Sequence, residues 1–190
     1  MKVSVVICTY SLDTYEALIE SIESVRSQTY DNTEIIVVVD GSQPLYDRIA
    51  AKYDSVITLL NDDNVGLSKS RNRGVERASG DIIAFLDDDA VADERWIEEL
   101  VSVYNNREAT AVGGQMVGDW VAGKPSFLPE EFYWLVGVTH RGFAEPGEEV
   151  RNTFGSNISF RREVFDEIGE FDPELGRRGS LNIQAEETIF

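Results

Sequence analysis

The chain has 190 residues, of which 42% are hydrophobic, so it can bury the core of one domain, or of one domain and part of a second. Acidic residues outnumber basic ones by 35 to 17 and give a net charge of −18, which argues against binding nucleic acid through its phosphates. Because the acids are dispersed and lysine is scarce, we also hypothesise a source with a high-salt cytoplasm.

The chain has one cysteine and one histidine. Cys8 lies in an apolar run, and we interpret it as a small core residue rather than a nucleophile. A single cysteine cannot form an intrachain disulfide, and no zinc site is predicted because the lone His140 has no partners at zinc-binding spacing. Met1 leads into a strand pattern without a signal peptide, and no apolar run approaches the roughly 20 residues that span a bilayer. We therefore expect a cytoplasmic protein, and leave association with the inner face of the membrane open.

Buried strands alternate with amphipathic helices over most of the chain. Apolar runs predict strands, and apolar residues at helical spacing predict helices. The expected order is a strand over 3–8, a helix over 14–28, a strand over 34–39, a helix over 45–53, a strand over 55–60, a helix over 66–79, a strand over 82–86, a helix over 93–104 and a strand over 110–117. Because these strands are apolar throughout, the order predicts an α/β fold, a mostly parallel sheet flanked by helices.

The pattern becomes irregular between residues 118 and 150. We interpret 118–150 as an irregular insert rather than a second domain. Its exposed-looking aromatic residues either line a groove or pack in the ordinary way, and they are Trp120, Phe127, Phe132, Tyr133 and Trp134. A strand over 154–160 and a short helix over 162–168 follow the insert.

Polar residues follow three of the predicted strands. Thr9 and Tyr10 come after the first strand, Asp40 after the second, and three consecutive acids, 87–89, after the fourth. The carboxyl ends of parallel strands meet at one edge of a sheet, where open α/β folds bind ligands. Because neighbouring carboxylates repel one another, the triplet favours a divalent cation with oxygen ligands, Mg²⁺ or Mn²⁺. A solvated turn that caps the next helix is the alternative.

The segment after the third strand adds a cation to these acids. Gly66 allows close backbone approach, and Arg71 can hold a phosphate or pair with the Asp triplet. The segment is neither a Walker loop nor a Rossmann fingerprint. An acidic protein that binds an anionic diphosphate needs a metal to bridge the charges, which links the triplet to a nucleotide.

An ordered set of motifs resembles family 2 glycosyltransferases. The set consists of Val3–Tyr10, Val39–Ser42, Asn64–Ser68, Arg71–Gly74, Phe85–Asp89, Gly155–Asn157 and Ala185–Thr188. The resemblance implies a GT-A catalytic domain over 1–190, with 118–150 on the acceptor side. It implies a nucleotide-diphospho-sugar donor, with UDP-sugars favoured, and a glycan or polyprenyl-phosphate-linked acceptor. Family members are commonly longer, so we expect the chain to be part of a longer protein.

The resemblance also implies roles for individual residues. It assigns contacts with the nucleotide sugar to Thr9, Tyr10, Asp40, Asn64, Gly66, Arg71, Asp87 and Asp88. It assigns the Mn²⁺ or Mg²⁺ to Asp89 and Asp87. It places the general base of an inverting direct displacement at Glu187, with Glu186 as the alternative, because the family usually has Asp where this chain has Glu187.

Two other classes of protein compete with this interpretation. A non-catalytic receiver or nucleotide-sensing domain also gathers acids around Mg²⁺, but its acid pair follows the first strand, where this chain has Thr9 and Tyr10. A nucleotidyltransferase would need a glycine- and arginine-rich first loop, and 11–13 is neither. Release of the nucleoside diphosphate from a donor sugar separates the three classes.

Overall fold

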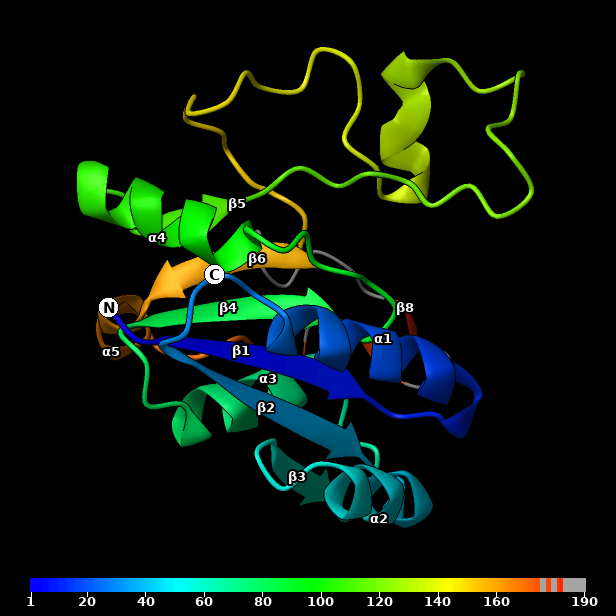
Figure 1. The fold of residues 1–190 in the computed structure, drawn as a ribbon, viewed down its shortest axis with the longest axis vertical. Helices are drawn as coiled ribbons and strands as arrows, with labels where there is room; N and C mark the ends of the chain where they lie inside the picture. The colour runs from blue at the N-terminus through cyan, green and yellow to red at the C-terminus, as the bar shows by residue number, and fades with distance from the viewer. Residues whose placement is uncertain (175–176, 179–180, 183–190) are drawn as a thin grey trace.

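The computed structural model describes residues 1–174, 177–178 and 181–182. Its central six-stranded sheet has the strand order β3-β2-β1-β4-β6-β5 (Figure 1). The parallel strands are β1 (Val3–Thr9), β2 (Thr33–Asp40), β3 (Ile57–Asn61) and β4 (Ile82–Asp87). β6 (Asn157–Arg161) is antiparallel to both of its neighbours, β4 and β5 (Ala111–Gly113). The predicted α/β class with a mostly parallel sheet is confirmed.

Helices cover both faces of the sheet. α1 (Tyr15–Arg26), α2 (Gln43–Lys52) and α4 (Trp96–Asn106) bury their apolar sides against one face, and α3 (Leu67–Arg77) and α5 (Arg162–Ile168) bury theirs against the other. Alternate residues of each parallel strand enter the two cores, so the strands are apolar on both faces. A short 3-10 helix, η1 (Leu12–Thr14), precedes α1, and β7 (Arg177–Arg178) pairs antiparallel with β8 (Leu181–Asn182).

Several predicted boundaries were wrong after residue 90. The helix expected over 93–104 begins at Trp96, because Asp93 folds into a turn and its side chain accepts the Arg95 backbone N–H. Val103 lies at the margin of a buried stripe formed by Ile97, Leu100, Val101 and Tyr104. This i, i+3, i+4, i+7 spacing is the inner face of a helix.

The strands after α4 are shorter than predicted. The strand expected over 110–117 is confined to Ala111–Gly113, because only this stretch pairs with β6. At Gly113 a Cβ atom would lie against the side chain of Thr153, so the chain is crowded where it leaves the sheet. β6 begins at Asn157 rather than at 154.

The segment between β5 and β6 extends beyond the edge of the sheet (Figure 1) and contains the 3-10 helix η2 (Glu130–Val136). Its irregular character is as predicted. Phe127, Phe132 and Trp134 are exposed, but Tyr133 is only 7% exposed and its ring packs on Trp120 at 5.4 Å. Within the described residues, we find no helix with the length and apolar character of a membrane span.

Glu34, at the start of β2, is the centre of a hydrogen-bond cluster. Its carboxylate accepts hydrogen bonds from the Lys2 ammonium group at 2.7 Å, the Ser4 hydroxyl at 2.5 Å and the Ser79 backbone N–H at 2.6 Å. Burial alone would raise the pKa of Glu34, but these hydrogen bonds together lower it to about 2. The folded state therefore favours the charged carboxylate.

Replacing Glu34 with glutamine should lower the free energy of unfolding at neutral pH by about 2 kcal/mol. The folded pKa lies below the unfolded value of about 4.3, so this stabilisation is complete above about pH 5 and is lost as the pH falls toward 2. Urea unfolding of both proteins at neutral pH and at about pH 3 measures the difference, which should shrink in acid. Glu20→Gln, which changes an exposed acid of α1, is the matched control; equal losses in both variants would contradict the prediction.

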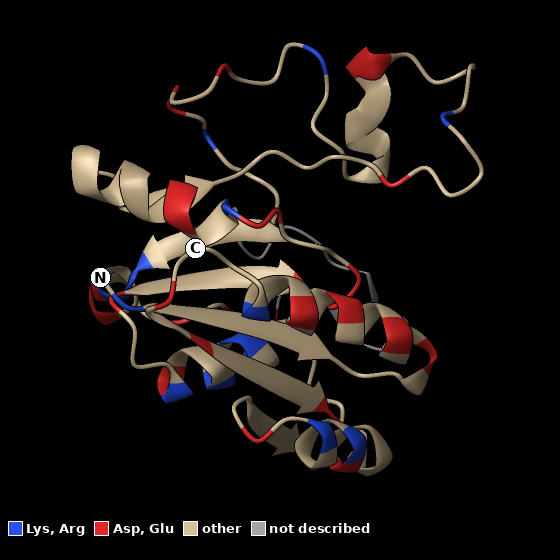
Figure 2. Ribbon diagram, viewed as in Figure 1, with Lys and Arg blue, Asp and Glu red and all other residues tan. Residues whose placement is uncertain are grey.

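The distribution of charge bears on the high-salt hypothesis. Acidic residues are spread over α1, α4 and the loops, whereas α3 carries more basic than acidic residues (Figure 2). Because dispersed like charges repel one another unless salt screens them, we expect molar KCl to raise the melting temperature by roughly 5–10 °C. Melting curves in low and molar KCl measure this, and sucrose at equal osmolality controls for excluded volume. Full stability at low salt would count against the hypothesis.

Candidate active site

The carboxyl ends of β1, β2 and β4 meet at one edge of the sheet. Thr9 is level with Val39 on β2, and Cys8 is level with Asp87 on β4. Thr9, Asp40 and Asp87 therefore end neighbouring strands side by side, as their order in the sequence predicts. A ligand at this edge can contact all three strand ends.

The three acids of the triplet point in different directions, because β4 ends at Asp87 and the chain turns at Asp88 and Asp89. Asp87 continues the side of β4 that faces α3, and its Oδ1 lies 3.9 Å from Nη2 of Arg71. Asp88 points to the other face, where its Oδ2 accepts hydrogen bonds from the hydroxyls of Thr9 at 2.6 Å and Thr14 at 3.0 Å. Asp89 is exposed. The three carboxylates thus have three different surroundings.

Burial raises the pKa of the Asp88 carboxyl. The hydrogen bonds from Thr9 and Thr14 oppose this shift, and the neighbouring charge of Asp89 adds to it. Asp88 is therefore the member of the triplet that the fold draws inward.

Asp40 organises the loop between β3 and α3. Its carboxylate accepts hydrogen bonds from the Asn61 side chain at 2.8 Å and from the backbone N–H groups of Val65 and Gly66, both at 2.9 Å. Gly66 has a φ of 95°, which disfavours residues with a Cβ, and it directly precedes α3. Asn64, in the same loop, is exposed. Asp40 thus sets the point at which α3 begins.

Arg71 is buried at the centre of α3, close to the same edge. Its guanidinium lies over the rings of Phe85 at 5.5 Å and Phe171 at 5.8 Å and donates a hydrogen bond to the backbone oxygen of Gly155 at 3.1 Å. The side chain of Asn72 holds Phe171 in place, because it donates to its backbone oxygen and accepts its backbone N–H. Stacking on the two rings and the hydrogen bond to Gly155 fix the orientation of the Arg71 guanidinium.

Tyr10 and Cys8 lie beside the edge in different environments. Tyr10 is 66% exposed and is free to stack on a flat ligand, as its predicted nucleoside contact requires. Cys8 packs against the core on the α3 side, and burial raises the pKa of its thiol to about 12. The thiol is therefore protonated at neutral pH, which supports its interpretation as a structural residue.

The acids at this edge suit a metal ion that is held by one or two carboxylates together with substrate and water, rather than by the protein alone. Among the described residues, no group of three or more His, Cys, Asp or Glu side chains could hold a metal ion by itself. Asp87 has a half-exposed side chain and Asp89 is exposed, so both can offer carboxylate oxygens to solvent. Mg²⁺ is commonly bound by one or two carboxylates together with substrate phosphates and water. This donor set fits such an ion.

Three residues of this region were not predicted from the sequence, and two predicted residues lie outside the part of the chain that the structure describes. Thr14, Asn72 and Phe171 were not predicted; a hydroxyl just before a helix was a usable signal for Thr14, whereas the pairing of Asn72 with Phe171 joins residues far apart in the chain. The predicted bases, Glu186 and Glu187, lie outside the described residues.

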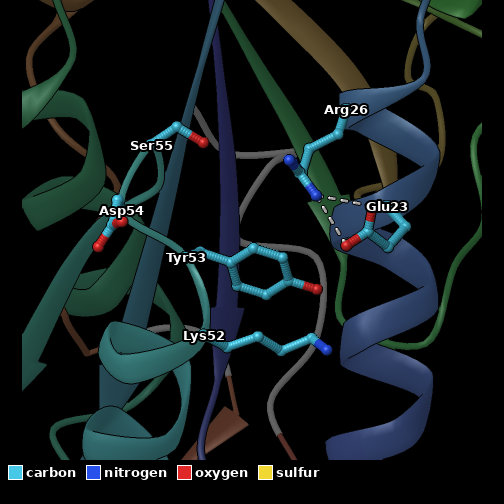
Figure 3. Close-up of a pocket in the computed structure, with 6 residues that line it drawn as sticks. All are labelled: Glu23, Arg26, Lys52, Tyr53, Asp54 and Ser55. Atoms are coloured by element: carbon cyan, nitrogen blue, oxygen red, sulfur yellow. Dashed lines mark hydrogen bonds and ion pairs between the residues drawn. The ribbon is translucent and has the colours of Figure 1, made fainter.

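A separate pocket lies beside the amino-terminal end of β3, away from the strand ends that carry the acids (Figure 3). The charged groups of Arg26 and Lys52 lie 5.3 Å and 5.5 Å from the centre of the Tyr53 ring, and Arg26 forms a salt bridge with Glu23. None of the predicted site residues lines this pocket.

The six-stranded, mostly parallel sheet with helices on both faces has the GT-A fold. Two solved structures share this fold at 20% identity. S. aureus TarS 1–349 in complex with UDP matches 100% of this chain and 53% of its own, with a TM-score of 0.73. The mannosyltransferase PcManGT from Pyrobaculum calidifontis, in complex with GDP-Man and Mn²⁺, matches 92% of this chain and 48% of its own, with a TM-score of 0.66.

The glycosyl transferase family 2 model matches residues 4–169, and the chain belongs to that family. It is 54% identical, over 98% of its length, to the glucosyl-dolichyl phosphate glucuronosyltransferase of Haloferax volcanii, and it covers 61% of that protein. It is 36% identical, over 95% of its length, to glycosyltransferase AglE of the same organism and covers 59% of it. The chain thus spans about three fifths of these two relatives.

Proposed function

We propose that residues 1–190 form the catalytic domain of a glycosyltransferase that uses a nucleotide-diphospho-sugar donor. The observation that carries this proposal is the meeting of Thr9, Asp40 and Asp87 at one sheet edge, beside Arg71, in a family 2 chain. Tyr10 and the loop held by Asp40 bind the nucleoside side of the donor, and the buried Thr9, whose hydroxyl donates to Asp88, supports Tyr10 from within the sheet edge. Its diphosphate lies toward Asp87 and Asp89.

A divalent cation completes the donor site in this proposal. Asp89 and Asp87 hold Mn²⁺ or Mg²⁺, and the bound ion supplies Lewis-acid stabilisation of charge on the departing diphosphate. The half-exposed carboxylate of Asp87 and the exposed one of Asp89 support this assignment, as does the Mn²⁺ in the PcManGT complex. Arg71 adds a fixed positive charge beside them.

The transfer itself is a single displacement. Glu187 takes the proton of the acceptor hydroxyl while its oxygen bonds to the anomeric carbon and the bond from that carbon to the diphosphate breaks. One displacement inverts the configuration at that carbon. Glu186 is the alternative base, and both assignments come from the family motif at the end of the sequence.

The acceptor is proposed from the relatives and from the insert. The name of the H. volcanii relative specifies glucosyl-dolichyl phosphate and glucuronic acid, so a glycosylated polyprenyl phosphate is the proposed acceptor and UDP-glucuronate the first donor to test. We assign the segment 118–150 to the acceptor side, and the exposed side chains of Phe127, Phe132 and Trp134 within it suit contact with a lipid. The protein then works in the cytoplasm at the inner face of the membrane.

A donor panel tests the proposal. The full-length protein is incubated with Mn²⁺, a short glucosyl polyprenyl phosphate and, in turn, UDP-glucuronate, UDP-glucose, GDP-mannose and dTDP-glucose. We expect acceptor-dependent release of UDP, with a product whose anomeric configuration, read by NMR, is opposite to that of the donor. Donor binding without transfer would favour the nucleotide-sensing alternative, and neither binding nor transfer would overturn the proposal.

A further inference from the structure

The middle acid of the triplet is tied to the loop between β1 and α1. One oxygen of Asp88 accepts hydrogen bonds from both Thr9 and Thr14. Thr9 ends β1 and is almost fully buried, and Thr14 ends η1 immediately before α1. A single carboxylate oxygen therefore joins the two ends of this loop to the tip of β4.

The loop presents Tyr10, and its other bonds are local. The Ser11 hydroxyl accepts the Asp13 backbone N–H at 3.1 Å, and the Thr14 hydroxyl also lies 3.2 Å from the Ser11 backbone oxygen. These contacts shape the loop, whereas the bonds to Asp88 attach it to the neighbouring strand. Hydrogen bonds between a hydroxyl and a partly buried carboxylate are charge-assisted and strong, so this attachment restricts the loop.

We propose that Asp88 is a positioning residue: it fixes the β1–α1 loop so that Tyr10 faces the nucleoside end of the donor, and it binds neither the cation nor the sugar. This inference rests on the proposed function and replaces the direct donor contact predicted for Asp88. Its two neighbours are directed elsewhere, Asp87 toward Arg71 and Asp89 toward solvent. The loop anchor and the metal ligands are thus separate members of one motif.

Steady-state kinetics of Asp88→Asn test the assignment. We expect a donor KM about tenfold higher, with kcat and the Mn²⁺ concentration for half-maximal activity each within about twofold of wild type. Thr14→Val should raise the donor KM by a smaller factor, about threefold, and Thr14→Ser, which keeps the hydroxyl, should restore it. In a Tyr10→Ala background, Asp88→Asn should add little further loss, because both changes disable the same contact.

Two kinetic results would overturn the inference. One is a higher Mn²⁺ requirement with an unchanged donor KM, which would make Asp88 a metal ligand. The other is full additivity of Asp88→Asn and Tyr10→Ala. If Asp88→Asn does not fold, the Thr14→Val and Thr14→Ser pair carries the kinetic test.

Hydrogen–deuterium exchange tests the anchor without any donor. Exchange at residues 10–14 should be faster in Asp88→Asn and Thr14→Val than in wild type. It should be unchanged in Thr29→Val, whose hydroxyl bonds to the α4 region instead. Unchanged exchange in the first two variants would refute the anchor even if the protein is an active transferase. Faster exchange in a protein that is inactive with every donor would refute the proposed function and leave the anchor standing.

Discussion

Replacing Asp89 with asparagine should lower kcat/KM by about three orders of magnitude, while the protein remains folded. Asp89 is exposed beyond the last residue of β4, so the change removes a charge without disturbing either core. A metal that stabilises the leaving diphosphate depends on such a carboxylate, and an amide oxygen is a much weaker ligand. Initial rates over a Mn²⁺ titration measure the loss, and thermal unfolding measures the fold.

The control for Asp89→Asn is Asp31→Asn. Asp31 is also exposed, but it lies in the loop before β2, at the edge where the parallel strands begin. The two substitutions change the net charge equally, so any general effect of charge should appear in both. Wild-type rates in Asp89→Asn, or an equal fall in Asp31→Asn, would contradict the assignment of the metal site.

The parallel half of the fold could be predicted from the sequence because its strands are buried on both faces. Runs such as 3–8 and 34–39 are almost entirely apolar. Such runs are typical of the strands of a parallel sheet that helices cover on both faces. The strand ends then follow from the topology, which is why Thr9, Asp40 and the Asp triplet were expected at one edge. The strand expected over 110–117 was too long, because β5 pairs over three residues only and lies at the sheet margin.

The directions of the site's side chains could not be predicted in the same way. Direction depends on where β4 ends and on partners from other elements, so the sequence did not separate the inward Asp88 from the outward Asp89. The stack on Arg71 depends on Phe171, whose place is fixed by a hydrogen bond to Asn72 across 99 positions of the chain. A contact between residues so far apart in the chain leaves no local sequence pattern, so neither periodicity nor motif spacing can predict it.

Replacing Asp40 with asparagine should weaken the fold and donor binding together. The Asp40 side chain is buried and accepts three hydrogen bonds, from Asn61, Val65 and Gly66. An amide has one acceptor oxygen, so in either orientation its NH₂ group faces a backbone or side-chain donor. We expect the free energy of unfolding to fall by about 2–3 kcal/mol, because buried donors lose their acceptor.

The loss of affinity for the donor in Asp40→Asn should follow from the loosened loop between β3 and α3, and not only from a missing contact with the donor. Gly66 directly precedes α3, which carries Arg71, so a loosened loop shifts the guanidinium away from the diphosphate side of the site. We expect the donor Kd, measured by calorimetry with Mn²⁺, to rise about tenfold. Asp47→Asn, an exposed acid of α2 that accepts a hydrogen bond from Gln43, is the matched control and should change neither quantity.

The two measurements on Asp40→Asn separate its two roles. A fall in donor affinity with unchanged stability would mean that Asp40 contacts the nucleoside directly, and that its hydrogen bonds to the loop carry little free energy. A fall in stability with unchanged affinity would mean that the loop is structural and that α3 keeps its position without it. Only the joint loss fits a carboxylate that shapes the donor site by holding the residues around Gly66, because those bonds then stabilise the fold and orient Arg71 at the same time.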